Sequence, residues 1–116
     1  MGTALAATVA SRDRPCALWC RSTDVASAIQ EHRRHPLQFP THELPLALRA
    51  TADIESAVRG ASLVIVAVPS PHFRATAQAL ARVFERRQLV LSATKGIELN
   101  SLKRMSEVLA DELGTD

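Results

Sequence analysis

The hydrophobic positions of this sequence form short continuous runs that are separated by stretches with helical spacing. The clearest run is Ser62–Val68, in which apolar, mostly β-branched residues follow one another until Pro69. Such a run predicts a strand buried on both faces, as in parallel sheets. Gln88–Ala93 predicts a second buried strand, and the apolar residues of Cys16–Cys20 predict a third.

Helices are predicted between these runs, because apolar residues recur there at the spacing of one helix face. The expected helices are Gly2–Arg12, Thr23–Arg34 with Ser22 or Thr23 as N-cap, Ile54–Arg59, Pro71–Arg86 and Ser101–Leu113. Prolines between residues 36 and 48 predict an extended loop, and Arg49–Thr51 a short strand after it. The alternation of strands and helices predicts βαβ units and a doubly wound, Rossmann-type parallel α/β sheet.

The order of the elements is unusual at the N-terminus, where the first predicted helix begins at Gly2 with no strand before it. In a doubly wound sheet the first strand is central and pairs on both sides. Without it, two strand edges would keep unpaired backbone groups, at a cost of about 1–3 kcal/mol each. We therefore expect a sheet that lacks its first strand, in a chain truncated at its front.

Composition excludes several classes of protein. A length of 116 residues fits one domain, and a net charge of +2 with scattered basic residues and 3% aromatics argues against nucleic-acid binding. The longest apolar run, Leu63–Val68, is far shorter than the roughly 20 residues of a membrane span. No basic segment followed by an apolar core opens the chain, so we expect a cytoplasmic protein. Cys16 and Cys20 would lie about 13 Å apart in a strand, which predicts two buried thiols and no disulfide.

Several segments occur in order along the chain: Gly2-Thr3-Ala4-Leu5-Ala6, Leu18-Trp19-Cys20-Arg21, Val66-Ala67-Val68-Pro69-Ser70, Ser92-Ala93-Thr94-Lys95-Gly96-Ile97-Glu98 and Met105-Ser106-Glu107-Val108-Leu109. Together they resemble the N-terminal domain of NAD(P)-dependent glycerol-3-phosphate dehydrogenase. The Ala-Thr-Lys-Gly-Ile-Glu element is the most specific of them. The resemblance covers residues 1–116 but only about the first third of such an enzyme. It implies that the helical substrate domain and its proton-donating lysine are absent, so no catalytic residue is assigned in this chain.

The sequence also departs from the family pattern. Gly2 matches the last glycine of the family's glycine-rich turn, but the first two glycines are absent and Met1 stands where a tryptophan is usual. The loop that usually carries Tyr-Leu-Pro-Gly reads Gln38-Phe39-Pro40-Thr41. These differences bear on whether the chain can bind the cofactor by itself.

Three residues near the N-terminus are predicted to bind the cofactor. Gly2 begins the first helix, where free N–H groups and the helix dipole favour a pyrophosphate. Arg21 follows a strand at the position where dinucleotide folds choose their cofactor, and an arginine there can pair with the 2′-phosphate of NADP. Arg21 and Ser22 therefore favour NADPH, while NAD remains possible. The alternative for Arg21 is a solvated surface arginine.

Three further candidates lie in the second half of the chain. Pro69 ends a buried strand at its carboxyl side, where ligands bind in open α/β sheets. Phe73 contacts the cofactor by resemblance, but its helical spacing from Ala77 is equally typical of core. Lys95 follows a strand and can neutralise a phosphate, and by resemblance it contacts both the cofactor and glycerol 3-phosphate; the alternative is an exposed loop lysine. Glu98 is expected to cap the helical region after it or to face solvent.

No metal site or other catalytic constellation is predicted. His32 and His35 could share a helix face, but no carboxylate or cysteine converges on them in the sequence. The remaining acids, among them Asp53, Glu55, Asp111 and Glu112, are interpreted as helix-surface residues.

These observations predict the cofactor-binding part of an NAD(P)-dependent sn-glycerol-3-phosphate dehydrogenase, an oxidoreductase. By resemblance, the intact enzyme would reduce dihydroxyacetone phosphate to glycerol 3-phosphate for phospholipid synthesis and could form a homodimer. The alternatives are a non-catalytic nucleotide-binding remnant and another two-domain dehydrogenase acting on a different hydroxy acid. For residues 1–116 alone, we expect no measurable turnover of dihydroxyacetone phosphate and weak or absent NADPH binding.

Overall fold

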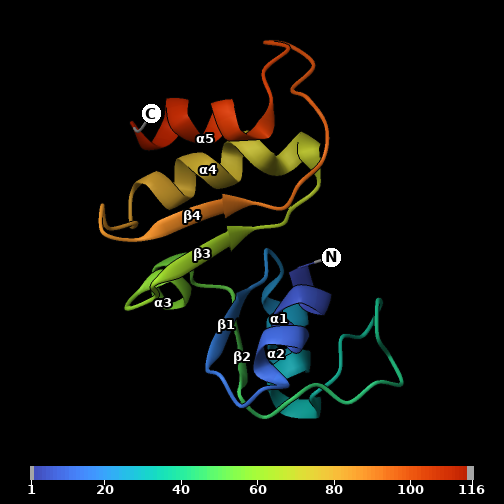
Figure 1. The fold of residues 1–116 in the computed structure, drawn as a ribbon. Coiled ribbons are helices and arrows are strands. Elements are labelled where there is room, and N and C mark those ends of the chain that lie inside the picture. Colours follow the sequence, from blue (N-terminus) through green and yellow to red (C-terminus); the bar gives the residue numbers. More distant parts are fainter. Residues whose placement is uncertain (1, 115–116) are drawn as a thin grey trace. The chain divides into compact units, whose positions relative to one another are not determined.

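The computed structural model describes residues 2–114, so the position of Met1 discussed above lies outside the described residues. The chain divides between Ala57 and Val58 into two compact units. Helices and strands alternate along it (Figure 1): α1 Gly2–Ala10, β1 Cys16–Trp19, α2 Thr23–His32, β2 Leu48–Thr51, α3 Ile54–Val58, β3 Leu63–Val66, the 3₁₀ turn η1 Ser70–His72, α4 Phe73–Ala81, β4 Leu89–Ser92 and α5 Met105–Leu113.

The first unit is built on a pair of parallel strands, β1 and β2, whose register runs from Cys16 beside Leu48 to Trp19 beside Thr51. Helix α1 packs on β1, and α2 packs on β2. The core between helices and strands consists of Ala6, Ala10, Ala26, Ile29, Leu44, Leu48 and Ala50. Most of these side chains are small, which lets the helices approach the strands closely. The two cysteines are free and partly buried, and burial raises the pKa of both thiols.

The loop between α2 and β2 is attached to this unit by Arg33. Arg33 ends α2 with a left-handed backbone, φ 57°, and its guanidinium donates to the carbonyl oxygens of Pro45 and Leu48, the second at 2.7 Å. His35 is also buried, and its Nδ1 accepts hydrogen bonds from the backbone N–H groups of Leu37 and Gln38. Burial lowers the pKa of His35. The loop predicted over residues 36–48 is therefore held in place by Arg33 and His35, which lie just before it.

The second unit contains the parallel pair β3 and β4, in register from Leu63 beside Leu89 to Val66 beside Ser92. Helices α4 and α5 pack on each other, and α5 also contacts β4 (Figure 1). The prediction that both strands are buried on both faces is wrong here. Leu63, Leu89 and Leu91 are 49–71% exposed, whereas Val66 on the opposite face is buried. Among the described residues of this unit, α4 and α5 cover one face only, and alternate strand side chains point to opposite faces.

Two helices are shorter than predicted by four or more residues at one end, whereas the other three end within two residues of the predicted position. The helix expected over Pro71–Arg86 is the turn η1 followed by α4, which ends at Ala81. The helix expected from Ser101 begins at Met105, because residues 97–104 close a loop of their own. In that loop the N–H of Glu98 donates to the carbonyl of Lys103 at 2.8 Å, and Leu102 is left-handed with φ 59°.

The predicted α/β class with parallel strands is confirmed. Within residues 2–114 the strands form two two-stranded parallel sheets, β1–β2 and β3–β4. No helix in this range is long and apolar enough to cross a membrane.

Candidate cofactor and phosphate site

The carboxyl ends of β3 and β4 lie side by side, and the chain segments beyond them stay together. The N–H of Ala93 donates to the carbonyl of Val66 at 2.9 Å, and the hydroxyl of Thr94 donates to the carbonyl of Val68 at 2.7 Å. A Cβ added at Gly96 would lie 3.8 Å from the Cβ of Ser70. Two segments that the sequence analysis singled out separately, around Pro69 and around Lys95, are therefore neighbours.

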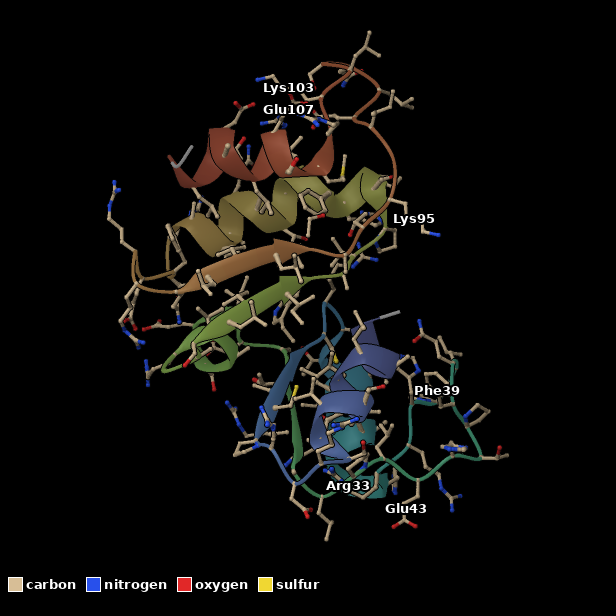
Figure 2. All side chains as sticks on the ribbon, viewed as in Figure 1. Arg33, Phe39, Glu43, Lys95, Lys103 and Glu107 are labelled. Atoms are coloured by element: carbon tan, nitrogen blue, oxygen red, sulfur yellow. The ribbon has the colours of Figure 1, made fainter. Side chains whose placement is uncertain are left out.

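Lys95 is the most prominent charged group at this edge. It is exposed, and Figure 2 shows its side chain extending away from the ribbon. The structure gives its ammonium group no carboxylate partner among residues 2–114. Gly96 follows with φ 110°, a backbone conformation that residues with a side chain rarely adopt. The geometry therefore presents an uncompensated cation at the carboxyl end of a parallel strand pair, where open α/β sheets bind ligands.

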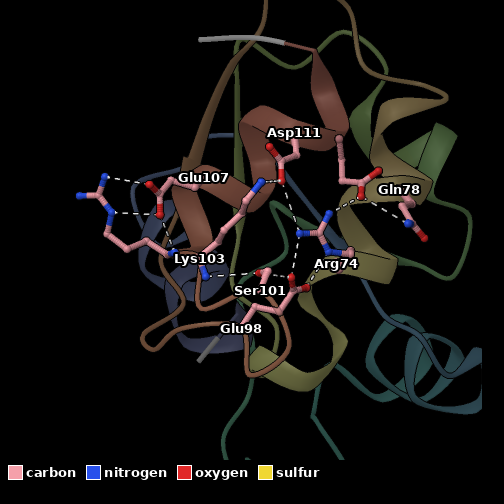
Figure 3. Close-up of polar contacts among 9 residues, drawn as sticks. Arg74, Gln78, Glu98, Ser101, Lys103, Glu107 and Asp111 are labelled. Carbon is pink, nitrogen blue, oxygen red and sulfur yellow. Dashed lines mark hydrogen bonds and ion pairs between the residues drawn. The ribbon is translucent and has the colours of Figure 1, made fainter.

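The loop that follows Lys95 is attached to α4 by Arg74, a contact that the sequence analysis did not predict. Nε and Nη2 of Arg74 reach the two carboxylate oxygens of Glu98 at 2.6 and 2.8 Å. Nη1 donates to Glu112 at 2.5 Å. Figure 3 shows the arginine surrounded by carboxylates. The expectation that Glu98 caps a helix or faces solvent is wrong: its side chain is 20% exposed and ion-paired.

Helix α5 is held by charged groups of the same region. Asp111 accepts from Lys103 Nζ at 2.5 Å and lies 3.5 Å from Arg74 Nη2. Asp111 is exposed on α5, as predicted for a helix-surface acid, and Glu112 is half-buried. Both carboxylates are also paired with cations, which was not predicted. The glutamate that bonds to the backbone at the start of α5 is Glu107, whose carboxylate accepts from the N–H of Arg104 at 2.8 Å.

Acidification is expected to leave the Arg74–Glu98 pair intact until the pH approaches 2. The hydrogen bond from Arg74, with a second from Ser101, lowers the pKa of Glu98 to about 2. Because this pKa lies below its value in the unfolded chain, the stabilisation is complete above the unfolded value of about 4.3 and is lost as the pH falls toward 2. A carbon-detected NMR titration of the Glu98 carboxyl measures this midpoint. Arg74→Met should raise it, and a midpoint near 4 in the unmodified chain would contradict the expectation.

The N-terminal candidates lie in the first unit. Arg21 follows β1 and is exposed, and none of the carboxylates in the described range pairs with it. Ser22 is the N-cap of α2, and its hydroxyl accepts from the N–H of Val25 at 3.3 Å. Gly2 is the first residue of α1. A short connection joins α1 to β1, on which α1 packs, so the start of α1 lies at the same end of the unit as Arg21.

Pro69 and Phe73 have different environments although only three residues separate them. Pro69 is exposed and precedes η1. Phe73, at the start of α4, has no exposed surface. The core position that the sequence left open for Phe73 is therefore realised in this structure, and its contact with a cofactor stays a prediction.

Groups of three or more His, Cys, Asp or Glu side chains suited to a metal ion do not occur within residues 2–114. His35 uses Nδ1 as a backbone acceptor, as described above. Besides Arg74, the sequence analysis missed Gln88, which is buried and bonded to three backbone groups. Neither residue belongs to a local motif, because the partners lie up to 38 positions away.

Comparison with known proteins shows which family this chain belongs to. The sequence model described as NAD-dependent glycerol-3-phosphate dehydrogenase N-terminus matches residues 1–116. This chain belongs to that family. The fold agrees, since a crystal structure of glycerol-3-phosphate dehydrogenase from Coxiella burnetii superposes with a TM-score of 0.90 at 26% identity, over 97% of this chain and 34% of that one.

Relatives in the family are similar over nearly the whole chain. The glycerol-3-phosphate dehydrogenase [NAD(P)+] of Stenotrophomonas maltophilia is 41% identical over 115 residues, which are 99% of this chain and 34% of that protein. The protein of the same name from Dehalococcoides mccartyi (strain 195) is 38% identical over 117 residues, 99% of this chain and 32% of its own length. This member of the family therefore spans about a third of the length of the relatives it matches.

Proposed function

We propose that this chain is the cofactor-binding part of an NAD(P)-dependent sn-glycerol-3-phosphate dehydrogenase and that Lys95 is its central phosphate-binding residue. The supporting observation is the exposed, uncompensated Lys95 at the carboxyl ends of β3 and β4. A lysine ammonium is a point charge with three donors, suited to a phosphate of either the cofactor or the substrate. Membership of the family makes dihydroxyacetone phosphate and glycerol 3-phosphate the proposed substrates.

The described residues have the chemistry that a dinucleotide requires. Arg21 is an exposed guanidinium at the end of β1, and Gly2 begins a helix whose first N–H groups have no partner within the helix. These donors suit the adenosine phosphate and the pyrophosphate, respectively. Arg21 supports a preference for NADPH. Ser22, at the start of α2, and Phe73, at the start of α4, are the further proposed cofactor contacts, and Pro69 bounds the site beside Lys95.

In this function the chain orients its ligands and neutralises their charge. Lys95 holds a phosphate at the strand ends, and Thr94 fixes the start of the segment that carries it through its bond to Val68. When bound, the reduced nicotinamide would supply the hydride for the C2 carbonyl of dihydroxyacetone phosphate, and by resemblance to the family a lysine of the substrate domain would supply the proton. The protein's contribution is position and electrostatics.

Lys95→Met is expected to weaken binding of glycerol 3-phosphate and NADPH by about tenfold each, which is the effect of losing one charge-assisted contact. Two-dimensional NMR of the ¹⁵N-labelled chain measures this, because it detects millimolar affinity residue by residue. Chemical shift changes in the unmodified chain should centre on Ser70 and on residues 94–97.

Arg82→Gln is the matched control, since it removes an exposed cation from the same unit at the far end of α4. It should leave both affinities unchanged. Equal affinities for the Lys95→Met variant and the unmodified chain would refute the role of Lys95. Equal losses in the two variants would show only a general effect of charge.

A second measurement tests whether residues 1–116 catalyse the reaction by themselves. Oxidation of NADPH by dihydroxyacetone phosphate is followed by absorbance with the chain at high concentration. We expect no turnover by residues 1–116, and measurable turnover would contradict this. A role in phospholipid precursor synthesis, a cytoplasmic location and a homodimer of the intact enzyme are proposed on the family alone.

A further inference from the structure

We infer that Arg74 is a positioning residue. Through a bidentate contact with Glu98 it holds residues 95–97, called here the Lys95 segment, in their binding geometry. This inference rests on the proposed phosphate-binding role of Lys95. It goes beyond that role because it assigns a function to a residue on a neighbouring helix that contacts neither cofactor nor substrate.

The Lys95 segment is suspended between two anchors. On one side, the Thr94 hydroxyl donates to the carbonyl of Val68 at 2.7 Å, just past the end of β3. On the other side, the Glu98 carboxylate is held by Arg74 of α4 (Figure 3). Only Lys95, Gly96 and Ile97 lie between the anchors, and all three are exposed. The direction in which Lys95 leaves the strand end therefore depends on both anchors.

The anchor at Glu98 is connected to the whole loop after it. The N–H of Glu98 donates to the carbonyl of Lys103, and its carbonyl accepts from the N–H of Leu102 at 2.7 Å. Ser101 Oγ donates to the Glu98 carboxylate at 2.5 Å. Residues 98–103 therefore form a closed loop that begins at Glu98, and Arg74 attaches Glu98 to α4.

Arg74 itself is not available to bind a phosphate. Its Nε and Nη2 are bonded to Glu98, and its Nη1 is bonded to Glu112. Asp111 lies 3.5 Å from Nη2 as a third carboxylate. An anion would have to displace these groups against their negative charge. Lys95, which has no such partners, remains the cation of the site, and Arg74 acts through its position.

The geometry makes this contact stronger than an ordinary surface ion pair. Single exposed pairs contribute little, but a bidentate arginine–carboxylate pair within a network is the exception. The side chains of Arg74, Glu98 and Glu112 are only 20–30% exposed. A lysine at position 74 would keep the charge but could not bind both oxygens of Glu98 and Glu112 together.

The test compares affinity for glycerol 3-phosphate, measured by NMR, with the order of the Lys95 segment, measured by ¹⁵N relaxation. Arg74→Met should weaken binding about fivefold and Arg74→Lys about twofold, within the usual coupling of contacting groups. Order parameters of residues 95–97 should fall toward the flexible range in Arg74→Met. Glu98→Gln breaks the same contact from the loop side and should act in the same direction. Arg87→Gln, which removes an exposed arginine paired with Glu85 in the same unit, should change neither quantity.

The decisive comparison is made in a Lys95→Met background. If Arg74 acts by positioning Lys95, Arg74→Met has no further effect on affinity there. An equal loss in both backgrounds, or no loss in either, overturns the inference while the role of Lys95 stands. If Lys95→Met alone leaves affinity unchanged, the proposed function fails, and the positioning role fails with it. Should Arg74→Met not fold, Glu98→Gln carries the same comparison.

Discussion

Replacing Phe73 with alanine is expected to lower the free energy of unfolding by about 3–5 kcal/mol, the usual cost of deleting a buried aromatic ring. Phe73 has no exposed surface and begins α4, whose buried face continues with Ala77 and Leu80. Helix α4 packs on α5, so the cavity left by the ring would open within the second unit. Urea denaturation followed by far-ultraviolet circular dichroism measures the loss.

A matched control is available in the same unit. Leu99→Ala removes a side chain that is 86% exposed, so it should change stability by less than about 0.5 kcal/mol. The outcome also decides between the two sequence-based interpretations of Phe73. A loss below about 1 kcal/mol would mean that Phe73 is not a core residue, and it would favour the other interpretation, in which Phe73 contacts the cofactor.

Gln88→Met is expected to cost about 2–4 kcal/mol, because it removes three hydrogen bonds without changing the length of the side chain. Gln88 is 5% exposed. Its amide nitrogen donates to the carbonyls of Val58 and Ala61 at 2.8 and 2.9 Å, and its amide oxygen accepts from the N–H of Glu85 at 2.8 Å. This one side chain therefore connects the residues just before β3 with those just before β4. Methionine would leave these backbone groups without a partner in a largely buried place.

The same substitution at Gln78 is the control. Gln78 is exposed on α4, and its single contact, with Glu112, is 3.4 Å long. Gln78→Met should therefore alter the unfolding midpoint very little. If the two variants lost equal stability, the hydrogen bonds of Gln88 would not be the cause.

The sequence predicts the parts of this fold that depend on local pattern. The strand–helix alternation, the N-cap at Ser22 (one of two candidates) and the end of β3 before Pro69 follow from spacing, capping chemistry and the rigidity of proline. The start of α5 could not be predicted from apolar spacing alone. Helix α5 starts only after the loop before it has closed. That closure needs the left-handed backbone of Leu102 and the hydrogen bond between Glu98 and Lys103.

The sequence predicts the central residue of the candidate site, Lys95, but not the contact between Arg74 and Glu98 that supports it. Lys95 comes shortly after the strand β4, which ends at Ser92, so its position could be inferred from the rule that ligands bind at the carboxyl ends of parallel strands. Arg74 and Glu98 are 24 positions apart, and no periodicity links them. The exposure of Leu89 and Leu91 could not be predicted either, because an apolar strand sequence does not indicate which face of the sheet a helix will cover.

Gly96 imposes a constraint of an unusual kind on this site. A Cβ there would meet only Ser70, at the ordinary contact distance of 3.8 Å, so space is not what requires glycine. The requirement comes from the torsion φ of 110°, which side chains of every size disfavour alike. The usual idea of a conservative substitution therefore has no meaning at this position. A single methyl group would strain the backbone beside Lys95 much as a large side chain would, because the strain depends on φ and not on the volume of the side chain.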